Sequence, residues 1–178
     1  PLRLRFVRAV PCVQHCVLAT VALLSALAAV PIVGQAQVFR LSYPTGREAG
    51  PVRGRAFLFV ARTDAREPRL QSGASRGSEP FFGVDVEALT PGTTITIDPS
   101  VPGFPVASLR QLPAGEYFVQ GLFLPYTKFA RADGHTIWAH MDAGEGQRFN
   151  NAPGSLVSEV RKVRIAPGSS DVVTLALD

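Results

Sequence analysis

The stretch "LRQLPAGEYFVQGLF", residues 109–123, decides the fold that the sequence predicts. A leucine is followed by a short corner containing proline and glycine, and a tyrosine then enters a run in which every second residue suits a core. Such a tyrosine can bond through its phenol to main chain just upstream and fix the crossover between two sheets. We therefore expect a strand whose core-facing residues are Tyr117, Val119, Gly121 and Phe123.

From residue 37 onward, short apolar runs recur between clusters of Gly, Pro, Asn and Asp, and no helical periodicity is sustained. This pattern is typical of an all-β domain. The expected strands are 37–43, 54–62, 80–86, 93–98, 116–124, 158–165 and 171–177. The corner at Tyr117 resembles the tyrosine corner of immunoglobulin-like domains, so the predicted fold is an Ig-like antiparallel β-sandwich.

Two of these strands have informative surroundings. Residues 54–62 are apolar on both faces, which indicates a central strand covered on both sides. Residues 158–165 carry Arg161, Lys162 and Arg164, which favours a solvated or edge strand, since charged side chains discourage pairing between sheets.

Residues 1–36 have the three parts of a secretory signal peptide. Three arginines and no acid precede an uncharged apolar stretch, and Gly34 and Ala36 supply small residues for a cut after Ala36. The alternative is a membrane anchor, because an apolar run of about 18 residues could just span a bilayer. Pro31 and the small residues favour cleavage. We expect an exported, periplasmic or extracellular domain of residues 37–178, without a stable membrane anchor.

Removing this leader changes the charge balance. Lys and Arg number 18 and Asp and Glu 14 in the whole chain. Three of the arginines lie in the leader, so the remainder carries 15 basic and 14 acidic residues. This balance gives no support to a nucleic-acid partner. Both cysteines, Cys12 and Cys16, also lie in the leader, so we expect neither a disulfide nor a thiol nucleophile in the domain.

Residues 73–77, "GASRG", match the G-x-S-x-G signature of serine hydrolases, with Ser75 in the nucleophile's place. That signature requires a buried strand before the serine and a helix directly after it. Here a polar stretch broken by Pro68 precedes the match, and Pro80 with a strand-like run follows it. We expect Ser75 to lie in a loop and the chain to hold no catalytic residue, although a self-contained hydrolase remains the alternative.

Two long segments, 66–80 and 125–153, are predicted to be irregular, and such segments are usually functional or mobile. The second holds the densest group of polar and aromatic residues. The candidate contact residues are Tyr126, Asp133, His135, Trp138, His140 and Asp142. Trp138 could stack on a ring of a ligand, pack into the sandwich or pack against a neighbouring domain.

The same segment raises the question of a metal ion. His135 and His140 are five residues apart, which places them on opposite faces if the residues between them form a strand. The segment also lacks the alternating oxygen ligands and glycine of a calcium loop. We therefore expect no metal ion and no other cofactor.

Taken in order, residues 80–98, 109–123 and 132–165 resemble the N-terminal region of a group of bacterial exported esterases. The run "DGHTIWAHMD", residues 133–142, is the most distinctive part of this resemblance. In that group an Ig-like β-sandwich precedes an α/β-hydrolase domain similar to enterochelin and feruloyl esterases.

The resemblance implies that the catalytic serine, acid and histidine belong to a domain after Asp178. The chain would then be a non-catalytic accessory domain of a serine esterase or related hydrolase, packed beside the catalytic domain or shaping access to it. The absence of an initiator Met and the end at a strand fit a fragment open at both ends. The alternative is a stand-alone secreted module that binds a carbohydrate or other ligand through Trp138, Tyr126 and Phe129.

Overall fold

The computed structural model describes residues 37–46, 51–141, 148–166 and 168–178. The predicted signal peptide, residues 1–36, and the candidate residue Asp142 lie outside the described residues. The strands are β1 (Val38–Ser42), β2 (Val52–Ala61), β3 (Phe81–Leu89), β4 (Thr94–Ile97), β5 (Gly103–Phe104), β6 (Gly115–Pro125), β7 (Thr127–Ala130), β8 (Thr136–Ala139), β9 (Leu156–Val157), β10 (Arg161–Ile165) and β11 (Val172–Ala176). The helical turns are α1 (Pro68–Gln71), η1 (Leu109–Gln111) and η2 (Phe149–Asn151).

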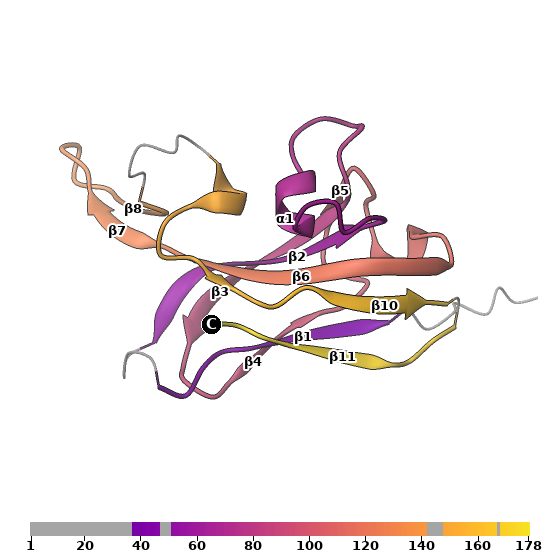
Figure 1. Cartoon of the computed structure of the whole chain (residues 1–178). Helices are drawn as coiled ribbons and strands as arrows, with labels where there is room; N and C mark the ends of the chain where they lie inside the picture. The colour runs from indigo at the N-terminus through magenta and orange to yellow at the C-terminus, as the bar shows by residue number, and fades with distance from the viewer. Residues whose placement is uncertain (1–36, 47–50, 142–147, 167) are drawn as a thin grey trace, which may run out of the picture. The chain divides into compact units, whose positions relative to one another are not determined.

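Two sheets packed face to face confirm the predicted all-β sandwich (Figure 1). The smaller sheet has the strand order β11–β1–β4. The larger sheet has the order β10–β6–β2–β3–β5, and β9 also pairs with β6. Strands β7 and β8 form a separate hairpin. All seven predicted strands are present, and the basic strand β10 lies at a sheet edge, as expected.

The tyrosine corner is formed as the sequence predicts. The phenol of Tyr117 donates a hydrogen bond of 2.7 Å to the main-chain carbonyl of Pro113, four residues upstream. Tyr117, Val119 and Phe123 are at most 1 % exposed and belong to the main core. At Gly121 the side chain of Leu41 from the opposite sheet approaches the backbone closely, so a side chain there would collide with it.

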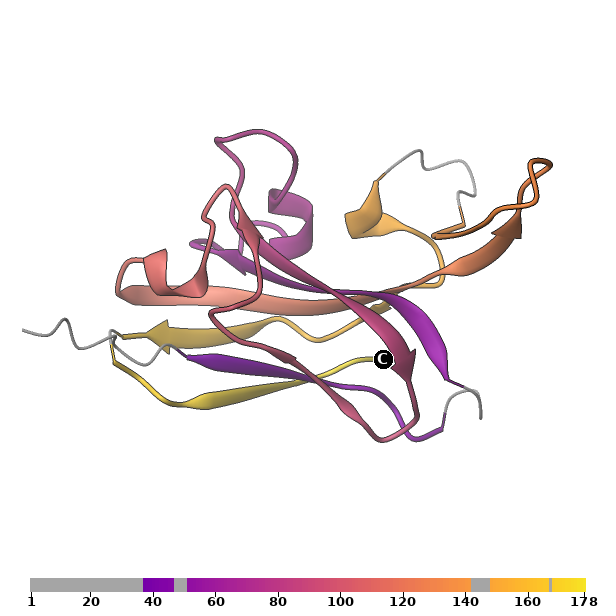
Figure 2. The same cartoon turned by 180° about the vertical axis from the view of Figure 1, so that it is seen from behind.

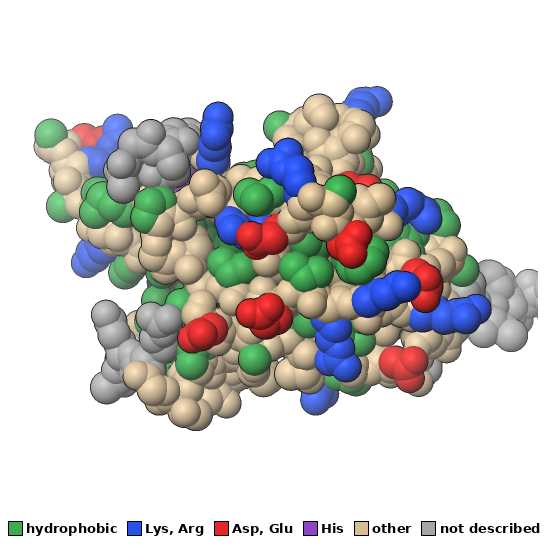
Figure 3. All heavy atoms as spheres, viewed as in Figure 1, with side chains coloured by type: hydrophobic (Ala, Val, Ile, Leu, Met, Phe, Trp, Pro, Cys, Tyr) green, Lys and Arg blue, Asp and Glu red, His purple; other side chains and the backbone are tan. Residues whose placement is uncertain are grey.

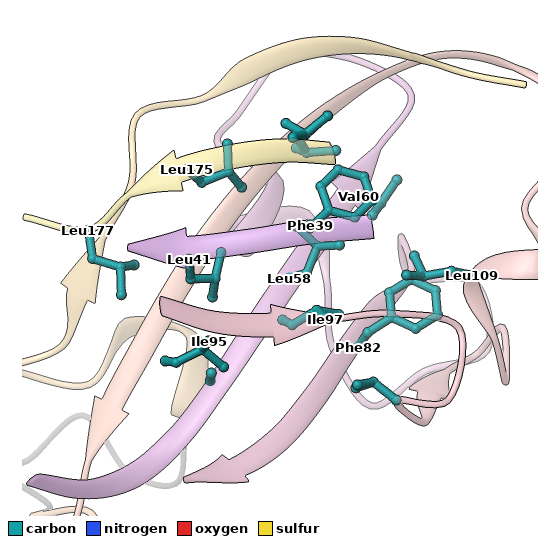
Figure 4. Packing of buried hydrophobic residues seen from close by; sticks show 14 of the residues in the cluster. Phe39, Leu41, Leu58, Val60, Phe82, Ile95, Ile97, Leu109, Leu175 and Leu177 are labelled. Atoms are coloured by element: carbon teal, nitrogen blue, oxygen red, sulfur yellow. The ribbon is translucent and has the colours of Figure 1, made fainter. Parts of the chain in front are cut away.

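The main core fills the space between the two sheets (Figure 4). Alternate residues of each strand point into it, so burial follows the two-residue period of a β-strand. In β4, for example, Ile95 and Ile97 are buried while Thr94 and Thr96 are exposed. The smaller sheet contributes Phe39, Leu41, Ile95, Ile97, Val173 and Leu175, and the larger sheet contributes Leu58, Val60, Phe82, Tyr117, Val119 and Phe123.

A second apolar cluster lies on the outer face of the larger sheet, away from the smaller sheet. It is built from Phe57, Phe59, Leu122, Leu124 and Ala152. The ring of Phe149 covers it, with its centroid 4.9 Å from that of Phe57 and 5.2 Å from that of Phe81. The helical turns α1 and η2 lie over this face (Figure 1). The prediction that 54–62 is covered on both sides is therefore confirmed.

Three features differ from the expectations. Strands β1 and β11 run parallel, whereas the other strand pairs of the described chain are antiparallel. The segment 66–80 contains the helical turn α1, and the segment 125–153 contains the hairpin β7–β8, so neither is wholly irregular. The helix α1 is little more than one turn long, and β7 and β8 lack the regular apolar–polar alternation that marks a strand in the sequence. Within the described ranges, no helix is long and apolar enough to cross a membrane.

Candidate functional site

The hairpin β7–β8 carries three of the six candidate residues, Asp133, His135 and Trp138, and projects beyond the sandwich (Figures 1 and 2). Its strands pair from Thr127 with Ala139 to Ala130 with Thr136. A tight turn closes it, in which Gly134 has a φ of 82° and its N–H donates to the carbonyl of Arg131. A projecting, ordered hairpin is well placed to meet a second molecule or domain.

The hairpin and the residues after it expose large apolar side chains. Ile137 is 43 % exposed, Trp138 40 % and Met141 51 %. Trp138 is therefore not packed into the sandwich core, which leaves the ligand and neighbouring-domain alternatives. Ile137 and Trp138 follow each other in β8 and so lie on opposite faces of the hairpin, which means that both faces offer exposed apolar area to a partner. We call Ile137, Trp138 and Met141 the hairpin patch.

A hollow of about 430 Å³ lies at the base of the hairpin. We call it the hairpin hollow, and its lining residues are Pro51, Val52, Arg53, Glu87, Tyr126 and Trp138. The guanidinium carbon of Arg53 lies 5.1 Å from the centroid of the Trp138 ring, and the same guanidinium forms an ion pair with Glu87. The pairing of β2 with β3 is irregular between Val52 and Gly54, where Arg53 lies. Such irregularities re-aim side chains beside binding sites.

Tyr126 joins the hollow to the sheet. Its N–H donates to the carbonyl of Arg53 at 2.8 Å, and its ring packs against the outer apolar cluster. Burial raises the pKa of the Tyr126 phenol, and the nearby carboxylate of Asp85 raises that pKa further. The phenol therefore stays protonated and can donate a hydrogen bond. Of the six predicted contact residues, the structure brings Tyr126 and Trp138 together in one hollow.

The other described candidates serve the hairpin turn or flank the hairpin. Asp133 accepts a hydrogen bond of 3.1 Å from the N–H of His135, and its other carboxylate oxygen pairs with Arg131 at 3.1 Å. The side chain of His135 is 80 % exposed, and its Nδ1 lies 3.3 Å from Asp133. His140 directly follows β8, at the other end of that strand from His135. In the described part of the chain, no three His, Cys, Asp or Glu side chains gather as metal ligands.

Ser75 lies in an exposed loop, as expected. Its hydroxyl is 2.8 Å from the hydroxyl of Ser78, and its carbonyl accepts from the N–H of the same residue. The four-residue helix α1 comes before this loop, and strand β3 comes after it. This order is the reverse of the strand–serine–helix arrangement that activates the serine of a hydrolase.

A polar network that the sequence did not predict lies on the outer face of the larger sheet. Gln120, only 2 % exposed, donates to Glu67 at 2.7 Å and to the carbonyl of Ser158 at 3.2 Å. Glu67 also accepts two hydrogen bonds from Arg69, of 2.8 and 3.2 Å. These bonds from Arg69, followed by the bond from Gln120, lower the pKa of the Glu67 carboxyl.

The network joins the two segments that were expected to be irregular. Arg69 donates to the carbonyl of Asn150 and the amide oxygen of Asn151, and Asn150 donates back to the carbonyls of Arg69 and Ser72. These contacts hold α1 against η2. The sequence signal was weak, because Gln120 is a single polar residue between Phe118 and Leu122 on its face of β6.

Comparison with known proteins adds no relative: the chain matches no family model, no curated protein and no solved structure. The resemblance to the N-terminal region of exported esterases therefore stays a prediction that rests on the residues quoted above.

Proposed function

We propose that residues 37–178 form a non-catalytic accessory domain of an exported esterase, and that the hairpin patch contacts the catalytic α/β-hydrolase domain. On this proposal the catalytic residues lie after Asp178, outside this chain. The accessory domain positions the catalytic domain and forms one wall of the approach to its active site.

The observation that carries the proposed contact is the position of Asp178 close to the base of the hairpin. The main chain of Asp178 exchanges two hydrogen bonds with Val157, of 3.1 and 3.3 Å, and Val157 pairs with Leu122 of β6. The hairpin base at Tyr126 is four residues further along the same chain, about 13 Å away in an extended strand. A domain that began after Asp178 would therefore start at the hairpin end of the sandwich (Figure 2).

The chemistry of the hairpin fits such a contact. Interdomain surfaces bury apolar and aromatic side chains, and Trp and Met are enriched in the centre of interfaces. The hairpin patch supplies both, and Ile137 directly precedes Trp138 in sequence. Arg53 and Glu87 beside Trp138 provide charged groups for its rim. The fixed hairpin loses little entropy when a partner packs on it.

The first test compares residues 37–178 with the chain extended through the reading frame after Asp178. We expect the extended protein to cleave short p-nitrophenyl esters and residues 37–178 to leave them intact. A stop codon directly after Asp178 would contradict the proposal, and so would ester turnover by residues 37–178 that Ser75→Ala abolishes.

The second test addresses the contact itself. The downstream domain is produced separately and titrated with residues 37–178 by calorimetry. Ile137→Ser combined with Met141→Ser should weaken binding by at least about tenfold, a loss of about 1.4 kcal/mol. Val172→Ser is the matched control, because Val172 is 48 % exposed but lies on β11 in the smaller sheet. Equal binding by the double variant and the wild type would rule out the hairpin patch.

A second candidate function is a stand-alone module that binds a sugar or another ring-containing ligand. The hairpin hollow favours it, because an exposed indole, a protonated phenol and an ion pair line one space. Ligand sites combine such aromatic walls with a few polar groups that fix orientation. Affinity electrophoresis through gels containing soluble polysaccharides separates the two candidates. Retardation that Trp138→Ala removes and His135→Ala retains would favour this second function.

A further inference from the structure

A second hollow lies on the outer face of the larger sheet, between α1 and η2. Its volume is about 380 Å³, and its walls include Arg66, Leu70, Ser72, Arg148, Phe149 and Asn151. We call it the outer hollow. Figure 3 shows Lys and Arg side chains on both flanks of the depression between the segment that contains α1 and the hairpin. The space has the size of a small-molecule site.

Among the residues that the structure describes, the charges that line the outer hollow do not cancel. Arg69, the arginine of the polar network, is paired with Glu67 and hydrogen-bonded to η2, so it holds the walls together. Arg66 and Arg148 line the hollow and have no carboxylate partner among the residues that the structure describes. Two guanidinium groups on one concave surface attract an anion.

A neutral donor adds to these charges. The amide oxygen of Asn151 accepts a hydrogen bond of 3.1 Å from Arg69, so its amide nitrogen is the group left to donate. The side chain of Asn150 is held by bonds to the carbonyls of Arg69 and Ser72, of 2.7 and 3.2 Å. The backbone that carries Asn151 and Phe149 is therefore fixed before any ligand binds, which lowers the entropy cost of binding.

One wall of the hollow is apolar. Phe149 and Leu70 are half-buried and face the same space as the two arginines. The Phe149 ring is held in place by Phe57 and Phe81 beneath it. An apolar wall gains nothing from a fully hydrated inorganic anion, whereas it stabilises the hydrocarbon part of an organic acid.

From these observations we infer that the outer hollow binds a small organic carboxylate. The carboxylate lies between the guanidinium groups of Arg66 and Arg148, whose planar forks match its two oxygens. The apolar or aromatic body of the ligand packs on Phe149 and Leu70. This site is independent of the hairpin patch and of the proposed accessory role.

The test titrates the purified protein with benzoate while amide and side-chain resonances are followed by NMR. Inorganic phosphate and benzyl alcohol serve as comparison probes, one without an apolar body and one without a charge. We expect saturable benzoate binding with a dissociation constant on the order of 1 mM or tighter. Both comparison probes should bind at least about tenfold more weakly.

Variants locate the site. Arg66→Gln combined with Arg148→Gln should weaken benzoate binding by at least about tenfold. Arg40→Gln with Arg164→Gln is the matched control, since it removes the same charge from exposed positions of β1 and β10. Arg148→Lys, which keeps the charge and loses the fork, should give an intermediate loss and provides a second readout if the double variant fails to fold.

Three outcomes would overturn the inference. Benzoate shifts that do not saturate would show that no site exists. Equal losses of benzoate affinity in the two double variants would show that the net charge of the protein, and not the outer hollow, accounts for the binding. Phosphate binding as tight as benzoate binding would mean that the hollow takes any anion and that its apolar wall plays no part.

Discussion

The phenol of Tyr117 donates to the carbonyl of Pro113 and accepts a hydrogen bond of 3.0 Å from Arg62. Tyr117→Phe removes both bonds and leaves the carbonyl without this partner, so we expect it to lower the free energy of unfolding by about 1–2 kcal/mol. Urea denaturation measures the change. Tyr43→Phe is the control, because Tyr43 is 6 % exposed and its hydroxyl makes no hydrogen bond within the described residues. Equal losses in the two variants would show that the corner bond contributes nothing.

Gly54 lies in β2 opposite Pro125 of β6. A Cβ at this position would overlap the main-chain carbonyl oxygen of Leu124 and lie 2.7 Å from the ring of Phe123. Gly54→Ala should therefore cost about 2–3 kcal/mol, because backbone cannot move aside as a side chain can. Gly77→Ala is the control, since a Cβ there meets no atom within 4 Å, and we expect a change of less than about 0.5 kcal/mol. Thermal unfolding of both variants provides the comparison.

Glu67 should make the stability of the domain depend on pH. The folded state lowers the pKa of its carboxyl, first through Arg69 and then through Gln120. The carboxylate therefore stabilises the fold above the unfolded pKa of about 4.3, and this contribution is lost as the pH falls through the lower folded value. The difference in melting temperature between wild type and Glu67→Gln should be largest near neutral pH and shrink on acidification.

A control separates this effect from general acid sensitivity. Glu116→Gln removes a carboxylate that pairs with Lys162 at the surface, with more than half of each side chain exposed. Exposed ion pairs contribute little, so this variant should follow the wild type closely. If the Glu67→Gln difference stays constant between pH 7 and pH 3, the network does not act through the charge of Glu67.

Trp138 is the single tryptophan of the chain, so tryptophan emission, excited where tyrosine absorbs little, reports on the hairpin hollow alone. Arg53→Ala removes the guanidinium from the indole face, and we expect acrylamide to quench the emission more strongly. The loss of stability should stay below about 1 kcal/mol, because an exposed cation–π contact is weak. Arg164→Ala, on β10, should leave the quenching unchanged. Unchanged quenching in Arg53→Ala would show that the two groups do not stack in solution.

The sequence was sufficient for the strands whose alternation runs over several residues. Thr94 to Ile97 alternate exposed and buried, and the run from Tyr117 to Phe123 carries the corner, because both patterns arise from local geometry. The parallel pairing of β1 with β11 left no such trace, since it joins residues more than 130 positions apart. Pairing direction depends on the chain path, which no local pattern records.

The candidate site was predicted only in part. The sequence placed Trp138 and Tyr126 in one segment, and the structure places them in one hollow with Arg53 and Glu87. Those two residues come from β2 and β3, and nothing in their own strands relates them to Trp138. The network around Glu67 was missed for the same reason, because its members become neighbours only when α1 and η2 cover β6.

Because β2 is apolar on both sides, the surface segments on the outer face of the larger sheet are needed to cover it, although their sequences look irregular. The segments around α1 and η2 cover the rings of Phe57, Phe59 and Phe81 and shield them from water. Trimming them to tight turns would leave an aromatic sheet face in contact with water, and such a face tends to associate with its own copies. A shortened version of this domain must therefore keep the segments around α1 and η2, or carry polar residues in place of Phe57, Phe59 and Phe81.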